Sequence, residues 1–226
     1  MHSGSIKSYV LRAGKMTMAQ KRSYANLARF FCIPVSGITS YKDIFGNSNP
    51  VIIEIGFGSG SATAQIAGQN PDKNYLGIEV YKAGIGKLLW EIEKHGLENI
   101  RIIEGDAAEI ISCLPKEAAS GFHVFFPDPW PKKRHHKRRL ITRPFTDALC
   151  NCLEPNGYVY MATDWEDYAH WAMAELLAAP GLNNQYQGFA PAQTWRPKTG
   201  FEKKGLEKNH KILELFFRKE VVYEQK

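Results

Sequence analysis

Short runs of apolar residues alternate along the chain with longer segments in which apolar residues recur every three or four positions. The compact runs are typical of buried strands, and the spaced pattern is typical of helices with one apolar face. We therefore expect strands at residues 50–57, 74–80, 99–106, 121–128, 156–164 and 210–219. Helices are expected at residues 16–31, 61–69, 81–96, 107–114, 138–153 and 165–179.

Strands that alternate with helices in this way predict an α/β fold with a mostly parallel, doubly wound, Rossmann-like sheet. We expect the C-terminal strand to run antiparallel to the others. A chain of 226 residues, 44% of them hydrophobic, can form one sizeable domain with its own core. We assign residues 1–42 to a basic N-terminal arm and helix, and residues 43–226 to the main domain.

Positive charge is concentrated in two places, although the formal net charge of the whole chain is only +6. Residues 1–42 contain seven Lys or Arg and no acidic residue, and residues 132–139 contain six more, again without an acidic residue. The remainder of the chain is acidic on balance. Two basic patches on an acidic body favour a polyanionic partner over an ordinary solvated surface.

The composition argues against a membrane protein and against a metalloprotein. The chain has no run of about 18 apolar residues and no apolar core of signal-peptide length, so we expect a cytoplasmic protein. Its four cysteines are scattered without a C-x-x-C pair, which predicts neither a disulfide framework nor a zinc site. His135 and His136 lack two further ligands nearby, so we expect no metal.

The first predicted strand ends in "EIGFGSG", which places Glu54 just before Gly56, Gly58 and Gly60. Glycines allow a tight turn and a close approach of a ligand to the backbone. A dinucleotide site would need glycine or alanine where Ser61 stands, and the carboxylate of Glu54 would repel a pyrophosphate. S-adenosylmethionine has no phosphate and carries positive charge, so this segment favours S-adenosylmethionine over a nicotinamide cofactor.

Three later strands also end in acidic residues, namely Glu79, Asp106 and Asp128. The carboxyl ends of parallel strands meet at one edge of the sheet, where such folds bind ligands. Glu79 is placed to accept hydrogen bonds from ribose hydroxyls, Asp106 to accept one from an adenine amino group, and Asp128 to face the methyl donor. We therefore expect these carboxylates to converge with Glu54 on one cofactor site.

The segment "FPDPWPKKRHHKRRL" places Asp128 and Trp130 among three prolines, directly before residues 132–139. The prolines fix the backbone of this turn. We expect Trp130 to offer a stacking face for a flat base and the following cations to hold the phosphates around it.

These segments, taken together, resemble a known family. The proline-rich segment together with "EIGFGSG", "GIEV", "EGDA", "ATDWEDYA" and "RPKTGFEKKG" resembles the bacterial tRNA (guanine-N7)-methyltransferases, in the same order, from about Ile6 to Phe217. The resemblance implies a class I methyltransferase domain at residues 43–226. It also implies S-adenosylmethionine as cofactor, S-adenosylhomocysteine as product and tRNA as partner. The sequence leaves open whether the protein is a monomer or a homodimer.

The resemblance also implies roles for individual residues. Glu54, Glu79 and Asp106 match cofactor ligands, and Asp128 matches the catalytic residue, which borders the cofactor. Matches to substrate contacts are Lys132, Asp164, Thr199, Gly200, Phe201 and Glu202. Matches to the RNA-binding stretch are Arg134, His135, His136, Lys137, Arg138 and Arg139. The implied target is the guanine at position 46 in the variable loop of tRNA.

Guanine N7 has a free lone pair, so an in-line attack on the methyl group needs no general base, and positioning should dominate catalysis. We expect Asp128 to orient the base and to stabilise the positive charge that develops on it. The nearest alternative is methylation of an exocyclic amino group, but such enzymes carry an Asp/Asn-Pro-Pro-aromatic turn that Asp128-Pro129-Trp130 lacks. A nicotinamide oxidoreductase and a catalytically dead RNA-binding protein are further alternatives, which Glu54 and the retained strand-end carboxylates disfavour.

Overall fold

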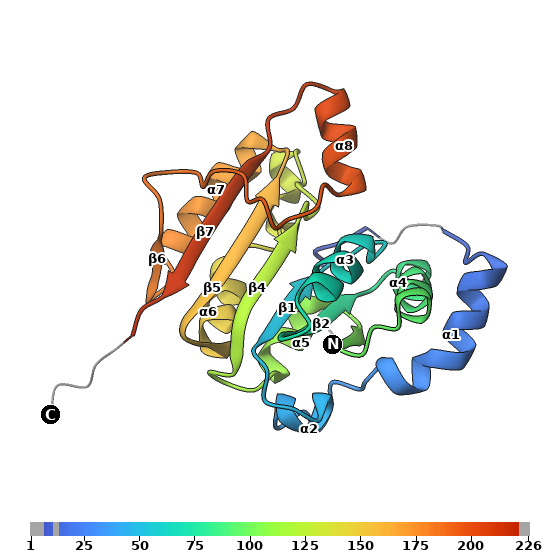
Figure 1. The fold of residues 1–226 in the computed structure, drawn as a ribbon. Helices are drawn as coiled ribbons and strands as arrows, with labels where there is room; N and C mark the ends of the chain where they lie inside the picture. Colours follow the sequence, from blue (N-terminus) through green and yellow to red (C-terminus); the bar gives the residue numbers. More distant parts are fainter. Residues whose placement is uncertain (1–6, 11–13, 222–226) are drawn as a thin grey trace, which may run out of the picture.

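A computed structural model describes residues 7–10 and 14–221 of the chain. Part of the predicted arm, including Arg12, lies outside the described residues, as do residues 222–226 of the C-terminal tail. The described strands form one sheet in the order β3-β2-β1-β4-β5-β7-β6 (Figure 1). Their bounds are β1 (Val51–Ile55), β2 (Asn74–Glu79), β3 (Ile100–Glu104), β4 (Ala119–Phe125), β5 (Leu153–Thr163), β6 (Leu182–Asn184) and β7 (Leu213–Lys219).

The strands β1 to β5 pair in parallel, whereas β7 runs antiparallel to β5 and to β6. This confirms the predicted doubly wound sheet with an antiparallel C-terminal strand. The chain moves outward from β1 to β3 and then returns to place β4 on the other side of β1. The order of the strands therefore reverses between β1 and β4, which is where open α/β sheets form their ligand crevice.

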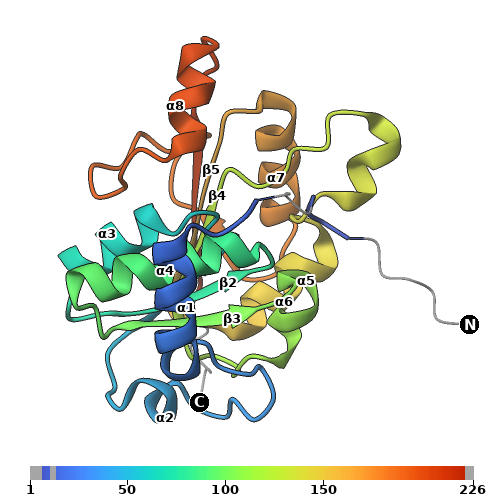
Figure 2. The same ribbon diagram turned by 90° about the vertical axis from the view of Figure 1, so that its right-hand side faces the viewer.

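Helices cover both faces of the sheet (Figures 1 and 2). Their bounds are α1 (Met18–Phe31), α2 (Tyr41–Phe45), α3 (Ser61–Gln69), α4 (Lys82–His95), α5 (Ala107–Ile110), α6 (Arg143–Cys152), α7 (Glu166–Leu177) and α8 (Gly200–Glu207), with 3-10 helices η1 (Ile111–Cys113) and η2 (Lys133–Arg138). One apolar core joins the sheet to α5, α6 and α7, and a second joins its other face to α3 and α4. Within the described ranges, no helix is both long enough and apolar enough to cross a membrane.

The structure differs from the predicted elements mainly around the basic segment, residues 132–139. The helix expected from residue 138 begins at Arg143, because Pro144 is tolerated in the first turn of a helix but not in its interior. The residues before it form η2 instead. The short elements α2, β6 and α8 were not predicted, since each is too short to show a clear hydrophobic period.

The helix α1 packs against α4 and leads directly to the outer edge of β3 (Figure 2). A capping box between Thr17 and Gln20 fixes its first turn. After its last turn, Cys32 pairs with Ile102 of β3, and the Ile33 N–H donates to the Ile102 carbonyl oxygen at 2.8 Å. The residues that follow α1 therefore cover part of the edge of the sheet.

Candidate active site

A cleft lies at the carboxyl ends of the parallel strands, where the strand order reverses. It is lined by the turns after β1, β2, β3 and β4 and by the N-terminal segment at residues 8–10. Its principal lining residues are Ile55, Gly56, Gly58, Ile78, Glu79, Gly105, Asp106, Phe125, Phe126, Pro127, Asp128, Leu140 and Phe201. The cleft thus combines apolar walls with three carboxylates from successive strand ends.

The turn after β1 has a backbone that suits glycine. Gly56 and Gly58 have φ values of 70° and 59°, in the left-handed region that other residues rarely adopt. The α4 helix packs directly on this turn, because a Cβ atom added at Gly84 would lie 1.9 Å from the Gly58 carbonyl oxygen. The backbone of the turn is therefore held by α4 on one side and lines the cleft on the other.

Glu79 ties the turns after β1 and β2 together. Its Oε2 accepts a hydrogen bond from the Gly58 N–H at 2.7 Å, and its Oε1 accepts from the N–H groups of Val80 at 2.7 Å and Tyr81 at 2.9 Å. Backbone donors stabilise the charged form of a carboxylate. Glu79 thus lines the cleft as a negative charge held in a fixed position.

Asp106 and Asp128 face the N-terminal segment across the cleft. Asp106 caps α5 by accepting from the Ala108 N–H at 3.0 Å, and it also accepts from the Ser8 hydroxyl at 3.5 Å. Asp128 Oδ2 accepts from the Val10 N–H at 3.0 Å. Both carboxylates can therefore receive N–H or O–H donors that enter the cleft.

Glu54 differs from the prediction that four carboxylates share one hollow. It is buried in β1, with 2% of its surface exposed, and it is not among the residues that line the cleft. Burial, with a smaller contribution from the negative charge of Glu79, raises the pKa of this carboxyl to about 7. Within the described part of the chain, Glu54 Oε2 has no hydrogen-bond partner. Glu54 therefore lies beneath the site rather than in its wall.

Trp130 also differs from its prediction as an open stacking face. Only 9% of the residue is exposed, and its indole N–H donates to the Ser8 carbonyl oxygen at 3.0 Å. The Arg138 guanidinium lies over the indole ring, 3.7 Å from its centroid. The sequence predicted an aromatic ring at this turn but could not show that the ring is covered by segments distant in sequence.

The basic segment contains both exposed and engaged cations. Its exposed members are Lys132, Lys133, Arg134 and Lys137, whereas His135, His136 and Arg138 are partly buried. Arg138 donates to the carbonyl oxygens of Lys7 at 2.9 Å and Tyr9 at 3.2 Å. Arg139 is buried, pairs with Asp167 and donates to the Pro129 carbonyl oxygen at 3.1 Å. Arg139 therefore faces the protein rather than solvent.

The remaining predicted substrate residues lie in different surroundings. Phe201 lines the cleft, but Thr199 caps α8 and Glu202 is buried in an ion pair with Arg196. Asp164 contacts His210 at 3.2 Å and lines a separate hollow near α7. Gly60, Lys132 and Gly200 are likewise not among the lining residues of the main cleft.

Two features of the site were missed from the sequence. Residues 8–10 line the cleft although they precede the first predicted strand by about forty positions. Arg196 lies in a loop without helical or strand periodicity, and only its buried partners reveal it. Arg196 begins the motif "RPKTGFEKKG", but the sequence does not indicate its role, because that role and the position of residues 8–10 depend on tertiary contacts.

The cleft fits a positively charged nucleoside cofactor. Its carboxylates can accept hydroxyl and amino donors and favour a cation, and its apolar walls suit an adenine ring. The glycine turn leaves space beside Gly56, where an added Cβ would meet nothing within 4 Å. Among the residues that the structure describes, no group of three His, Cys, Asp or Glu is arranged to hold a metal ion.

Comparison with known proteins adds independent information. The family model Methyltransf_4, described as "Putative methyltransferase", matches residues 48–215. The chain is 47% identical over 216 residues to the tRNA (guanine-N(7)-)-methyltransferase of Nitrosospira multiformis, covering 95% of this chain and 94% of that protein. In an alignment of 240 positions, gaps included, it is 43% identical to the enzyme of the same name from Treponema pallidum strain Nichols. This alignment covers 94% of this chain and 95% of that protein.

Solved structures share the fold at low sequence identity. The 16S rRNA methyltransferase KamB superposes with a TM-score of 0.61 at 14% identity, covering 80% of this chain and 93% of that one. A 16S rRNA (adenine(1408)-N(1))-methyltransferase from Catenulisporales acidiphilia, determined with its cosubstrate, gives a TM-score of 0.61 at 12% identity, covering 82% and 92%. These neighbours place the sheet and helices within the class I, Rossmann-like methyltransferase fold.

Proposed function

This chain belongs to the tRNA (guanine-N7-)-methyltransferase family, and we propose that its target is the guanine at position 46 in the variable loop of tRNA. The family membership makes it an enzyme that uses S-adenosylmethionine to methylate guanine N7 in tRNA. The main structural support for placing this reaction in the cleft is the set of residues that line it. Glu79, Asp106 and Asp128 line one hollow beside the glycine turn, at the reversal of strand order.

We assign the cofactor to the part of the cleft between the turns after β1, β2 and β3. When bound, S-adenosylmethionine supplies a methyl group on a positively charged sulfur. Glu79 would accept hydrogen bonds from the ribose hydroxyls, and Asp106 would accept one from the adenine amino group. The turn at Gly56, Gly58 and Gly60 lets the backbone approach the cofactor closely. Glu54 is buried beneath this turn and does not line the cleft, so we assign it no direct contact with the cofactor.

Asp128 orients and stabilises the guanine. A carboxylate at this position would accept hydrogen bonds from the N1 and N2 N–H groups of guanine. These bonds would orient the base for attack by N7 on the methyl group. It also stabilises the positive charge that appears on the ring as N7 is methylated. The hydrogen bond from the Val10 N–H supports this role, because it shows that Asp128 accepts an N–H donor inside the cleft.

The basic segment holds the tRNA backbone. Its exposed side chains Lys132, Lys133, Arg134 and Lys137 are available to phosphates, and they follow directly on the turn that carries Asp128. Guanine N7 lies in the deep and narrow major groove of A-form RNA, so the target base must sit in a loop or an opened tertiary contact. Recognition then depends on tRNA shape and phosphates. Because its substrate is tRNA, we infer that the enzyme acts in the cytoplasm.

The proposal is tested by incubating the protein with methyl-labelled S-adenosylmethionine and bulk tRNA, followed by nucleoside analysis. We expect label in 7-methylguanosine. A tRNA transcript in which adenine replaces guanine 46 should not be labelled, whereas the unchanged transcript should be. Label in a nucleoside methylated on an exocyclic amino group would support the alternative activity, and label in the altered transcript would overturn position 46.

A further inference from the structure

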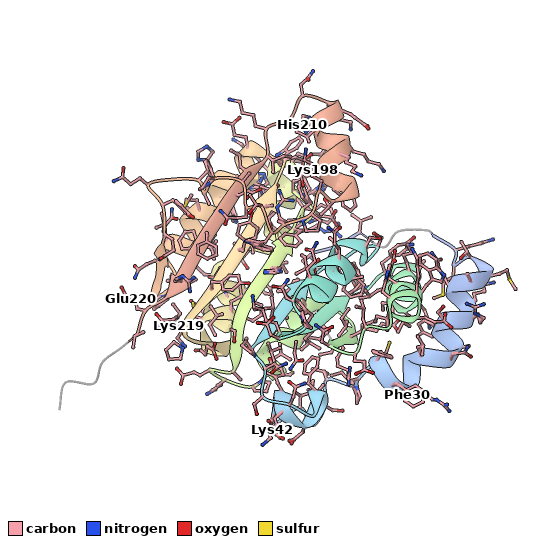
Figure 3. All side chains as sticks on the ribbon, in the orientation of Figure 1. Phe30, Lys42, Lys198, His210, Lys219 and Glu220 are labelled. Atoms are coloured by element: carbon pink, nitrogen blue, oxygen red, sulfur yellow. The ribbon has the colours of Figure 1, made fainter. Side chains whose placement is uncertain are left out.

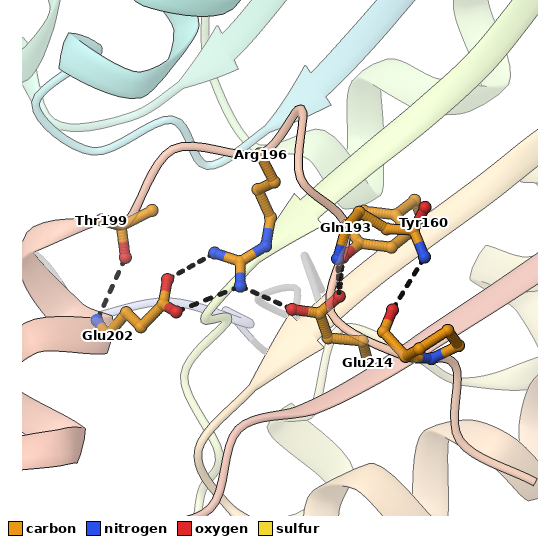
Figure 4. Close-up of polar contacts among 7 residues, drawn as sticks. Tyr160, Gln193, Arg196, Thr199, Glu202 and Glu214 are labelled. Atoms are coloured by element: carbon orange, nitrogen blue, oxygen red, sulfur yellow. Dashed lines mark hydrogen bonds and ion pairs between the residues drawn. The ribbon is translucent and has the colours of Figure 1, made fainter.

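Arg196 forms the centre of a buried charge cluster beside the cleft (Figure 4). Only 8% of the residue is exposed, and its guanidinium donates to both carboxylate oxygens of Glu202, at 2.5 and 3.2 Å. The same guanidinium donates to Glu214 Oε1 at 2.6 Å. One buried arginine therefore joins the first turn of α8 to the strand β7.

Glu214, the member of this cluster that lies on β7, is held by further hydrogen bonds. Glu214 accepts a hydrogen bond from the Tyr160 hydroxyl and another from the Gln193 N–H at 3.1 Å. The neighbouring Trp195 ring stacks on His123 of β4 with a centroid separation of 4.9 Å. The loop that carries Arg196 is thus fixed against β4, β5 and β7, and the arginine extends from it toward α8.

Buried ion pairs are expensive to desolvate, so they contribute little net stability compared with an apolar replacement. What such a pair supplies is a defined geometry, because the charges must meet in one arrangement. The bidentate contact between Arg196 and Glu202 fixes the orientation of the first turn of α8. Thr199 reinforces this turn by capping it, since its hydroxyl accepts from the Glu202 N–H at 3.1 Å.

The turn that Arg196 fixes carries an aromatic ring into the cleft. Phe201 precedes Glu202, lines the cleft and is 38% exposed. Its ring lies beside the glycine turn, 3.8 Å from the position that a Cβ atom on Gly58 would occupy. Three residues beyond the other end of α8, His210 contacts Asp164 at 3.2 Å. The helix is therefore held at both ends with Phe201 at the mouth of the site.

We propose that Arg196 is a positioning residue for methyl transfer, which acts through Glu202 to hold the ring of Phe201 as a wall of the cleft. This inference rests on the proposed function, since the wall matters only if the cleft holds the cofactor and the base. Of the aromatic residues that line the described cleft, Phe201 is exposed, whereas Tyr9 and Tyr81 are half-buried and Phe125 and Phe126 are buried. With the indole of Trp130 covered, Phe201 is therefore the most accessible ring for a flat ligand. Arg196 itself touches neither ligand.

The test is a double-mutant cycle in kcat/KM for tRNA, made from Arg196→Lys, Phe201→Ala and the combined variant. Lysine keeps the charge but cannot form the bidentate bridge between two carboxylates. We expect each single variant to lower kcat/KM about tenfold, and the combined variant to be no worse than Phe201→Ala alone, because both remove the same wall. S-adenosylmethionine affinity, measured by calorimetry without tRNA, should change less than about threefold in Arg196→Lys.

Arg143→Lys serves as the matched control, because Arg143 forms an exposed ion pair with Asp147 on α6 at 3.0 Å. A combined variant reduced about a hundredfold, the product of the single effects, would overturn the proposal, as would Arg196→Lys with control-level turnover. If Arg196→Lys does not fold, Glu202→Gln gives the same comparison with the Arg196–Glu214 pair intact. Wild-type binding and turnover in the same assays decide separately whether the proposed function holds.

Discussion

At the scale of single residues, Asp128 is held by an unusually constrained turn. Phe126 and Trp130, two residues before and two after it, have positive φ values of 52° and 47°. Bulky residues rarely adopt this conformation, and such strain persists where the surroundings enforce it, often at functional sites. The turn therefore places the carboxylate with little freedom to move away from an incoming base.

Replacing Asp128 with Asn should lower single-turnover methyl transfer about a hundredfold, because a neutral amide cannot balance the charge that develops on guanine. The Kd for S-adenosylmethionine should change only a few-fold. Single-turnover kinetics and calorimetry measure the two quantities separately. Asp72→Asn, at an exposed loop position before β2, is the control. Turnover retained in Asp128→Asn would remove this carboxylate from the mechanism.

Glu54 predicts a pH dependence of stability. Its pKa is raised from an ordinary 4.5 to about 7 by burial, so the folded protein binds the proton more tightly than the unfolded chain. Its contribution to stability is therefore full below about pH 4.5 and is lost as the pH rises through 7. The loss amounts to about 3 kcal/mol when the carboxyl is fully ionised.

The measurement is the free energy of unfolding in urea between pH 5 and pH 8, for wild type and Glu54→Gln. Wild type should lose about 2 kcal/mol relative to the variant over this range, because the amide does not ionise. A difference between the two proteins that stays constant with pH would show that Glu54 has an ordinary pKa.

At the scale of elements, the glycine turn depends on how closely α4 approaches it. Replacing Gly84 with Ala would drive a Cβ atom to 1.9 Å from the Gly58 carbonyl oxygen, so the helix or the turn must shift. We expect a loss of about 1–3 kcal/mol in stability and weaker binding of S-adenosylmethionine. Thermal unfolding and calorimetry test both effects.

Gly68→Ala in α3 is the matched control, because a Cβ atom there would meet Leu97 at an ordinary 3.4 Å. That variant should leave binding unchanged and keep or slightly raise stability, since alanine favours helix more than glycine does. Equal cofactor affinity in Gly84→Ala and Gly68→Ala would show that the packing of α4 does not control the turn.

The elements that the sequence predicted well are those with a local signal. The strand β2 ends at Glu79, and β3 ends at Glu104, two residues before Asp106. Both are largely apolar runs followed by polar turns, so their positions and the acidic residues that follow them could be predicted directly. The arrangement of α8 could not, because Arg196 and Glu214 fix it from elsewhere in the chain. Likewise, only the folded chain shows that Glu54 is buried beneath the cleft.

At the scale of the whole molecule, the exposed cations of the basic segment lie on the same side as the cleft. The exposed cations of the basic segment follow the turn at the carboxyl edge of the sheet, where the cleft lies. Lys42, by contrast, lies at the opposite end of the molecule from His210 and Lys198 (Figure 3). A polyanion drawn to the basic segment would therefore be delivered to the cleft side.

Replacing Lys133, Arg134 and Lys137 with Gln should weaken tRNA binding and flatten its dependence on salt. Each lost phosphate contact lowers the log–log slope by roughly 0.7 to 0.9, so the three together should lower it by about 2. Filter binding from low to physiological salt measures the slope. Gln at the exposed positions Lys42, Lys94 and Lys116 is the charge-matched control. Equal slopes for the two variants would show that the basic segment does not contact RNA.

The pairing of Cys32 and Ile33 with β3 has a practical consequence for experiments on the N-terminal arm. A deletion that extends past α1 strips more than positive charge, because it uncovers backbone donors and acceptors on the outermost strand. Uncovered strands recruit strands from other chains, and the shortened protein would precipitate or form fibrils. Lost activity in such a truncation would then reflect insolubility. Only deletions that stop before Lys7 spare both the edge of the sheet and the cleft-lining residues 8–10.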